Sequence, residues 1–440
     1  MLPERLPVLV AGGGPAGFMA AITAAEAGVR GVHLLEATPE PLHKVRISGG
    51  GRCNVTHACW DPRELVAHYP RGSRALRGPF SRFAAGDALA WFHEHGLELV
   101  EEPDGRLFPR SNRSSSVVDT LRRAAARAGV TLHTGLALQS AAPAPDGFAL
   151  HLRGPHLSGQ SAGIMARQLV LATGSHPSGR RVAASLGHTL VPPVPSLFTL
   201  ALAGEPLLAL AGVVMDPVGL SLELPDGGIQ RQRGPVLITH WGLSGPATLR
   251  LTAFAARQLH ACRYRARLRV DWSGGRSQAD LEELFQQARS TQARRQLGNA
   301  RPWPELSRRL WQHLLAEAGV EPERRWAELT RELQGRLIRA LLDSCYAVSG
   351  RGPFGEEFVT AGGVPLGEVK LATMESRLQP GLFIVGELLD VDGITGGFNF
   401  QHCWTSGWIA GHSISGSASG SAISGSDRRS RTSAGTSQPG

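Results

Sequence analysis

A glycine-rich turn between two apolar segments near the N-terminus constrains the fold of this chain more than any other feature. Residues 8–11 are apolar, Gly-Gly-Gly-Pro-Ala-Gly follows at 12–17, and an alanine-rich run leads to a second apolar segment that ends in Glu36. A lone GxGxxG arises often by chance, but this one has a strand before it, a helix after it and an acid 24 residues beyond Gly12. The pattern predicts a β-α-β unit that binds a dinucleotide.

The residues of this turn have separate predicted roles. We expect Gly12 to allow the tight turn, Gly14 to let backbone amides approach a pyrophosphate, and Gly17 to let the helix lie close to the sheet. Pro15 and Ala16 begin that helix, and its N-terminus would face the phosphate charge. The turn therefore predicts the phosphate end of a cofactor site.

Glu36 indicates which dinucleotide fits. Its carboxylate would accept hydrogen bonds from an adenosine ribose and would repel a 2′-phosphate, so FAD or NAD is favoured over NADP. A glycine turn in another kind of α/β domain is the alternative interpretation. A signal peptide is disfavoured because glycines and a proline interrupt the apolar stretch.

Length and composition predict a globular protein of two or three domains. The chain has 440 residues, of which 42% are hydrophobic and 19% charged, and it contains no apolar run long enough to cross a bilayer. Five cysteines without regular spacing favour a reducing compartment, and the cytoplasm is the predicted location. No metal site and no membrane contact are predicted.

The net charge of +9 comes from arginine far more than from lysine. Such a charge suits an anionic cofactor or a polyanion such as RNA. Arginine-rich proteins are also common in GC-rich genomes, so the charge alone does not decide between these explanations.

Changes of pattern along the chain predict its domains. Short strands and glycine turns replace the α/β pattern after a proline-rich stretch at 190–195, helical periodicity follows, and an α/β pattern then returns. The serine- and glycine-rich C-terminal end has too little apolar content to fold and is predicted to be disordered. The predicted parts are a nucleotide-binding domain at 1–193 and 351–412, a β-barrel at 194–273, a helical subdomain at 274–350 and a tail at 413–440.

The returning α/β segment favours FAD over NAD. An apolar strand ends in Gly386-Glu387, and Gly396, Gly397, Phe398 and Asn399 lead into a helix. This arrangement resembles the C-terminal motif of two-dinucleotide-domain flavoproteins, in which the acid holds a ribityl hydroxyl and the helix N-terminus faces the flavin. The turn Ala172-Thr173-Gly174 resembles a second marker of that superfamily.

Five further stretches narrow the resemblance to one family. The chain resembles the HI-type flavoproteins, the NAD(P)/FAD-dependent oxidoreductases of the BaiN/RdsA-like group. The resemblance implies an α/β fold in which a Rossmann-like FAD-binding domain of the glutathione-reductase-like kind is split by an inserted β-barrel and helical part. The stretches are SGGGRCNVT at 48–56, THWGLSGP at 239–246, TAGGV at 360–364, TMES at 373–376 and GELLDVDG at 386–393.

The first of these stretches supplies further predicted cofactor contacts. We expect its glycine amides and Arg52 to approach the phosphates or the flavin, with Cys53 packed beside the cofactor. Five residues separate Cys53 from Cys59, whereas four separate the redox-active pair of flavin disulfide reductases, which disfavours a working disulfide. The family usually has Asn where this chain has His57, and a loop residue without chemistry is the favoured interpretation of that position. The predicted contacts of this stretch are Gly50, Gly51, Arg52, Cys53 and Asn54.

His240 is the predicted catalytic residue. It lies in the second of the five stretches, whose loop is expected to return over the flavin, and a histidine can donate a proton near neutral pH. A buried structural histidine is the alternative.

The predicted function is transfer of a hydride from flavin N5 to a conjugated C=C acceptor. Family members are associated with reduction of the enone of steroid-like bile acids and of a uracil ring in ribosomal RNA. The arginine-rich helical insert slightly favours an RNA contact over a small-molecule substrate. NAD(P)H has no second GxGxxG unit and is expected to bind transiently over the flavin. The alternatives are a non-enzymatic assembly protein with a structural flavin and an FAD-dependent oxidase.

Overall fold

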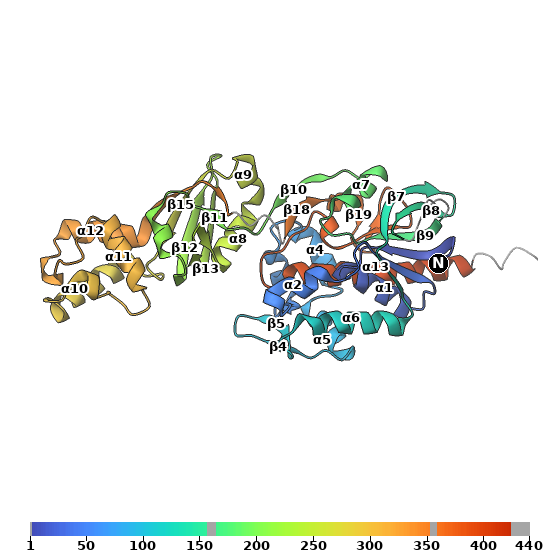
Figure 1. The fold of residues 1–440 in the computed structure, drawn as a ribbon, viewed down its shortest axis with the longest axis horizontal. Coiled ribbons are helices and arrows are strands. Elements are labelled where there is room, and N and C mark those ends of the chain that lie inside the picture. The colour runs from blue at the N-terminus through green and yellow to red at the C-terminus, as the bar shows by residue number, and fades with distance from the viewer. Residues whose placement is uncertain (1, 156–163, 353–358, 424–440) are drawn as a thin grey trace, which may run out of the picture. The chain divides into compact units, whose positions relative to one another are not determined.

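The computed structural model describes residues 2–155, 164–352 and 359–423, and it divides into two compact units (Figure 1). The Rossmann unit comprises residues 1–192, 362–391 and 396–440, and the inserted unit comprises residues 193–361 and 392–395. The inserted unit contains both the predicted β-barrel region and the predicted helical region. The separate boundaries of these two regions stay a prediction.

Parallel strands form the centre of the Rossmann unit. In the described part of the chain the parallel strands follow the order β21-β9-β1-β2-β6, and the antiparallel strands β19 and β20 extend the β21 edge. Strand β1 is buried along most of its length, as expected for a strand with helices on both faces. The bounds are β1 (Arg5–Ala11), β2 (Val32–Glu36), β6 (Thr131–Thr134), β9 (Ile164–Leu171), β19 (Val369–Lys370), β20 (Glu375–Ser376) and β21 (Leu382–Ile384).

Two helices of the Rossmann unit pack at unusually short distance. Helix α1 (Pro15–Glu26) is rich in alanine, and helix α13 (Phe398–Ile423) crosses it through two glycines. A Cβ atom at Gly407 would lie 2.5 Å from the carbonyl oxygen of Ala16, and one at Gly411 would lie 2.6 Å from Cβ of Thr23. Only glycine at these positions allows the observed separation of the two helices.

Further helices and strands complete this unit. Helices α5 (Ala85–Glu94) and α6 (Ser114–Ala128) precede β6, and Gly129 ends α6 in a left-handed conformation, with φ of 83°. The strands β7 (Ala137–Ala144) and β8 (Gly147–Arg153) follow β6 and form an antiparallel pair.

The predicted start of the disordered tail at 413 was wrong. Helix α13 continues to Ile423, and Ile414 is fully buried, so packing holds the start of this segment although its composition alone does not favour a helix. The rest of the predicted tail, 424–440, lies outside the described residues. No helix among the described residues has the length and apolar run that a membrane span requires.

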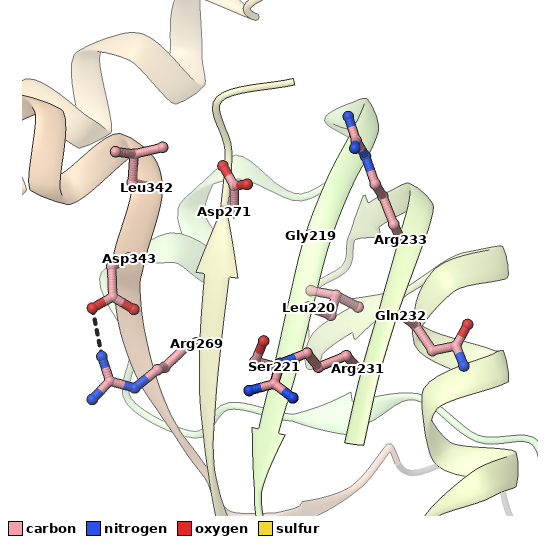
Figure 2. Close-up of a pocket in the computed structure, with 10 residues that line it drawn as sticks. All are labelled: Gly219, Leu220, Ser221, Arg231, Gln232, Arg233, Arg269, Asp271, Leu342 and Asp343. Atoms are coloured by element: carbon pink, nitrogen blue, oxygen red, sulfur yellow. Dashed lines mark hydrogen bonds and ion pairs between the residues drawn. The ribbon is translucent and has the colours of Figure 1, made fainter. Parts of the chain in front are cut away.

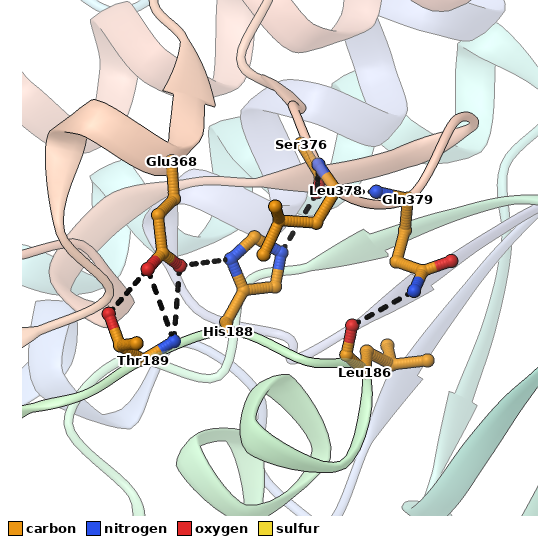
Figure 3. Close-up of polar contacts among 7 residues, drawn as sticks. All are labelled: Leu186, His188, Thr189, Glu368, Ser376, Leu378 and Gln379. Atoms are coloured by element: carbon orange, nitrogen blue, oxygen red, sulfur yellow. Dashed lines mark hydrogen bonds and ion pairs between the residues drawn. The ribbon is translucent and has the colours of Figure 1, made fainter.

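A buried histidine joins two distant segments of the Rossmann unit (Figure 3). Nδ1 of His188 donates to Glu368 at 2.8 Å, and Nε2 accepts from the Ser376 hydroxyl at 2.9 Å. The Ser376 oxygen already accepts from the amides of Leu378 and Gln379, at 3.0 and 2.9 Å. Although the order Ser-His-Glu resembles a hydrolase triad, His188 and Ser376 are buried, and the serine oxygen already accepts two backbone hydrogen bonds. The network therefore fixes the chain structurally.

The inserted unit contains an antiparallel sheet that closes on itself. Strands β16 and β17 are almost continuous in sequence, yet β16 pairs with β15 at one end of the sheet and β17 pairs with β11 at the other. The described sheet order is β16-β15-β12-β13-β14-β11-β17. The bounds are β11 (Leu200–Ala201), β12 (Val214–Glu223), β13 (Ile229–Ile238), β14 (Gly242–Ser244), β15 (Ala266–Asp271), β16 (Ser344–Val348) and β17 (Gly350–Arg351). Two helices that the strand-like pattern did not predict, α8 (Pro246–Phe254) and α9 (Ala256–Ala261), also lie here.

Helices α10 (Gln278–Thr291), α11 (Arg308–Glu317) and α12 (Arg331–Asp343) complete the inserted unit. Trp311 and Trp326 are fully buried and stack at 6.3 Å, and each indole N–H donates to a backbone carbonyl. Trp303 is 5% exposed. These tryptophans therefore anchor a core, and they are not available to stack on bases. The sheet and the helices share one hydrophobic cluster.

The close contact between α1 and α13 leads to a stability prediction. Gly411→Ala should destabilise the Rossmann unit by about 1–3 kcal/mol, because the new methyl group would overlap Thr23 and Ala20. The control is Gly416→Ala in the same helix, where a Cβ meets nothing within 4 Å and the change should be neutral or stabilising. Thermal and denaturant unfolding of both variants measure the difference, and equal stability would contradict the packing described.

Candidate dinucleotide-binding site

The predicted phosphate turn lies between β1 and α1, and at Gly12 and Gly17 the neighbouring backbone leaves no room for a side chain. Gly12 has φ of 117°, and a Cβ there would lie 2.4 Å from the carbonyl oxygen of Ala172. A Cβ at Gly17 would lie 1.9 Å from the carbonyl oxygen of Gly12. Gly14 is different, because a Cβ there would meet nothing within 4 Å. The turn is therefore tightly packed against the protein at Gly12 and Gly17, and it leaves free space beside Gly14.

The start of α1 has the features of an anion site. Gly14 is the N-cap residue and supplies no side-chain cap, and Pro15 occupies the first helical position. The helical hydrogen bonds begin with the Phe18 amide, which donates to Gly14 at 3.0 Å, so the amides of Ala16 and Gly17 precede the helical ladder. Donors of this kind, at the positive end of a helix dipole, suit a pyrophosphate.

Glu36 lies at the end of β2, directly beside this turn. Its Oε2 accepts from the Gly13 amide at 3.1 Å, and its Oε1 accepts from the amide and hydroxyl of Thr38 at 2.7 and 2.8 Å. A Cβ at Gly13 would lie 2.8 Å from Cβ of Glu36. The GxGxxG pattern does not specify a glycine at position 13. Here only glycine fits, because a larger residue would collide with Glu36.

The turns after β9 and β21 meet beside the start of α1. Gly386 has φ of 67°, and a Cβ there would lie 2.8 Å from Cβ of Ala16. A Cβ at Gly174 would lie 3.6 Å from Oε2 of Glu387. The structure thus brings the predicted residues of both turns, which include Ala172, Thr173 and Gly174, to the phosphate turn.

The segment that begins α13 packs on the strand after the glycine loop. A Cβ at Gly397 would lie 2.7 Å from the backbone of Thr56, and the Thr56 hydroxyl donates to Gln401 at 2.6 Å. The ring of Phe398 is buried and stacks on His68 and His57, with centroids 4.2 and 4.9 Å away. His57 is therefore part of an aromatic cluster around Phe398. Gly396 precedes this cluster, and Asn399 is half-buried in the first turn of α13.

The glycine loop interrupts α2 (His43–Gly51). Gly49, Gly50 and Gly51 all have positive φ, and no atom lies within 4 Å of a Cβ built on Gly50 or Gly51. The guanidinium of Arg52 donates to Glu102 at 2.7 Å and lies 3.9 Å over the ring of Phe108. The pairing of Arg52 with Glu102 was not predicted from the sequence, and contact of Arg52 with a cofactor stays a prediction.

The two cysteines near this loop are buried free thiols. Burial raises the pKa of Cys53 to about 12 and that of Cys59 to about 11. Thiols with such pKa values are poor nucleophiles at neutral pH.

Buried polar atoms without a partner occur at several of the assembled positions. Oδ1 of Asn54, Oγ1 of Thr173 and Nδ1 of His402 are buried and lack a hydrogen-bond partner. Such atoms normally have partners, so they are suitable contacts for a bound group or for water. Among the described residues no group of three or more His, Cys, Asp or Glu side chains is arranged to hold a metal ion.

His240 belongs to the inserted unit. It is exposed on the turn between β13 and β14, next to Trp241, which is 48% exposed, and Thr239 organises this turn by bonds to Gly242. Its predicted role at the flavin stays a prediction.

A hollow of about 460 Å³ lies on the sheet of the inserted unit (Figure 2). Arg231, Arg233 and Arg269 line it together with Asp271 and Asp343, and Arg269 bonds to Asp343 and Glu223. Residues 193–361 contain 21 arginines, no lysine and 17 acids, a net charge of +4 out of +9 for the whole chain. Positive charge is therefore not concentrated in the insert.

Comparison with known proteins identifies the family. The family model described as the HI0933-like protein Rossmann domain matches residues 6–413. The chain belongs to the HI0933-like family. It is 30% identical over 407 residues to a 3-dehydro-bile acid delta(4,6)-reductase of Clostridium scindens, and the alignment covers 91% of this chain and 97% of that protein. It is 29% identical over 422 residues to a ribosomal RNA dihydrouridine synthase of Escherichia coli, and this alignment covers 93% of this chain and 98% of that protein.

A solved structure shows the same fold. The 3-ketosteroid delta1-dehydrogenase of Sterolibacterium denitrificans superposes with a TM-score of 0.52 at 13% identity, over 94% of this chain and 100% of that one. The family resemblance and the Rossmann-type α/β fold predicted from the motifs are confirmed. The family places the protein among flavoprotein oxidoreductases.

Buried His402 makes the stability of this site depend on pH. Burial lowers the pKa of His402 to about 4, and its Nε2–H donates to the carbonyl of Gly386 at 3.3 Å. The unfolded chain takes up this proton near pH 6.5 and the folded one only near pH 4, so stability should fall as the pH drops between these values. The loss attributable to His402 is on the order of 3 kcal/mol.

His402→Gln should flatten this part of the pH profile, because glutamine retains a donor without binding a proton. His412→Gln, at an exposed position of the same helix, is the control and should leave the profile unchanged. Denaturant unfolding from pH 7.5 to 4 measures both, and parallel profiles of His402→Gln and the unchanged protein would contradict the assignment.

Proposed function

We propose that this protein is an FAD-dependent oxidoreductase that takes electrons from NAD(P)H and reduces a conjugated C=C bond. The observation that carries the proposal is the single assembly, within the Rossmann unit, of the open N-terminus of α1, the acid Glu36 and the turn at Gly386-Glu387. These segments are far apart in sequence and converge at one end of the parallel strands, where α/β folds bind ligands.

The residues present fit FAD. The amides around Gly14 and Ala16 would hold the pyrophosphate, Glu36 the adenosine ribose, and Glu387 with the start of α13 the flavin half. The unpaired buried atoms of Asn54 and Thr173 would gain partners. When bound, FAD supplies hydride transfer between a donor and an acceptor.

The protein side chains would bind and orient the cofactor and the acceptor, and one of them would deliver a proton. The buried thiols of Cys53 and Cys59 are protonated at neutral pH, so they do not form a reactive pair. His240, exposed on its turn, is the proposed proton donor to the acceptor. If so, His240→Ala should slow reduction of the acceptor without weakening cofactor binding.

The acceptor is proposed at the level of its chemistry. The relatives named above are a bile acid reductase and a ribosomal RNA dihydrouridine synthase, at almost equal identity. Both reactions add a hydride and a proton across an activated C=C bond. The net charge of +4 of residues 193–361 is close to their share of the whole chain's +9 and favours neither substrate, so both a steroid-like enone and a uracil in RNA are proposed as acceptors to test.

An anaerobic titration with NADH and NADPH tests the proposed activity. We expect the flavin absorbance near ~450 nm to bleach with at least one donor, and an enone or RNA acceptor to restore it. A flavin that stays oxidised would support a structural cofactor instead. Rapid oxygen consumption with peroxide release and no added acceptor would support an oxidase.

Glu36→Gln tests the adenosine end of the site. Loss of the carboxylate charge should weaken FAD binding about tenfold, as expected for one charge-assisted hydrogen bond. Glu40→Gln, an exposed acid of the following loop, is the control and should bind FAD normally. Fluorescence titration of the apoprotein with FAD gives both affinities, and equal values would argue against the role of Glu36.

A further inference from the structure

Lys44 connects three of the segments that form the candidate site. It is the second residue of α2, and Leu42, just before the helix, donates its amide to the carbonyl of Gly13 at 2.9 Å. The Lys44 ammonium donates to Oε2 of Glu387 at 2.6 Å and to the Ser175 hydroxyl at 3.1 Å. The side chain of Lys44 therefore joins the turns that follow β9 and β21. Two residues before it, Leu42 is bonded to the phosphate turn.

The ion pair with Lys44 compensates the negative charge of the Glu387 carboxylate in this site. The side chain of Glu387 is only 16% exposed, so an isolated carboxylate there would be poorly solvated. It would also repel the negatively charged cofactor that the neighbouring turn is built to receive. Lys44 neutralises the carboxylate and holds one of its oxygens in a defined direction.

We propose that Lys44 is a positioning residue of the FAD site, which holds the Glu387 carboxylate in a fixed orientation and places a positive charge beside the bound cofactor. This inference rests on the proposed function. The proposed role differs from that of an ordinary surface ion pair. At the 49% exposure of Lys44, such a pair would contribute little to stability or to cofactor binding.

The chain contains a closely matched control. Its other lysine, Lys370, forms an ion pair with Glu375 at 2.8 Å in the same unit, with side-chain exposures of 47% and 23%. Lys370 and Glu375 belong to β19 and β20 and are not among the residues assembled at the candidate site. The variants Lys44→Met and Lys370→Met therefore remove similar interactions at different places.

The experiment measures three quantities for the unchanged protein, Lys44→Met, Lys44→Arg and Lys370→Met. They are the FAD dissociation constant of the apoprotein, the midpoint potential of the bound flavin and the melting temperature of the apoprotein. Lys44→Met should weaken FAD binding about tenfold or more and shift the potential to a more negative value, since a positive charge favours the reduced, anionic form. Lys44→Arg should restore most of both, and Lys370→Met should match the unchanged protein.

The outcomes separate this proposal from the proposed function. If the unchanged protein binds FAD and Lys44→Met matches Lys370→Met in affinity and potential, Lys44 forms only a surface ion pair and the inference is wrong. If the unchanged protein binds no FAD, both the proposed function and the inference fail. A melting temperature of apo Lys44→Met that falls far below that of Lys370→Met, with no rescue by Lys44→Arg, would assign the lysine a purely structural role.

Discussion

Helix α1 and the turn before it are in contact with several other parts of the Rossmann unit at distances that only glycine permits. Gly12 touches Ala172, Gly386 approaches Ala16, and Gly407 and Gly411 bring α13 against the same helix. A side chain larger than hydrogen at any of these positions would displace a strand end, a turn or a helix. The positions of the phosphate turn, the returning turn and the last helix therefore all depend on the thin, alanine-rich surface of α1.

Charge is compensated within the same small region. Glu36 accepts three hydrogen bonds from neighbouring backbone and hydroxyl groups, and Glu387 receives the ammonium of Lys44. Each acid is held before any cofactor binds, so a ligand would not have to pay the entropy of ordering it. Such preorganisation is consistent with a site that binds its cofactor tightly and exchanges only the other reactants.

The local parts of this arrangement were predictable and the long-range parts were not. The GxGxxG pattern, the acid after β2 and the glycine at the end of α6 each depend on residues close in sequence. The pairing of Lys44 with Glu387 joins residues 343 apart, and the pairing of Arg52 with Glu102 depends on the folding of the helices and strands that lie between them. Composition also did not predict that helix α13 continues past 413, where burial of Ile414 outweighs the weak helix preference of the neighbouring serines and glycine.

The long excursion of the chain out of the Rossmann unit, at residues 193–361, has a consequence for modularity. Strands β10 (Val191–Pro195) and β18 (Thr360–Gly363) pair with each other, so the two ends of this segment lie one strand spacing, ~5 Å, apart. A segment with adjacent ends resembles a domain spliced into a surface loop. Because this segment has a hydrophobic core of its own, its sequence can change without rebuilding the Rossmann unit, except where it meets residues 392–395, which also belong to the inserted unit.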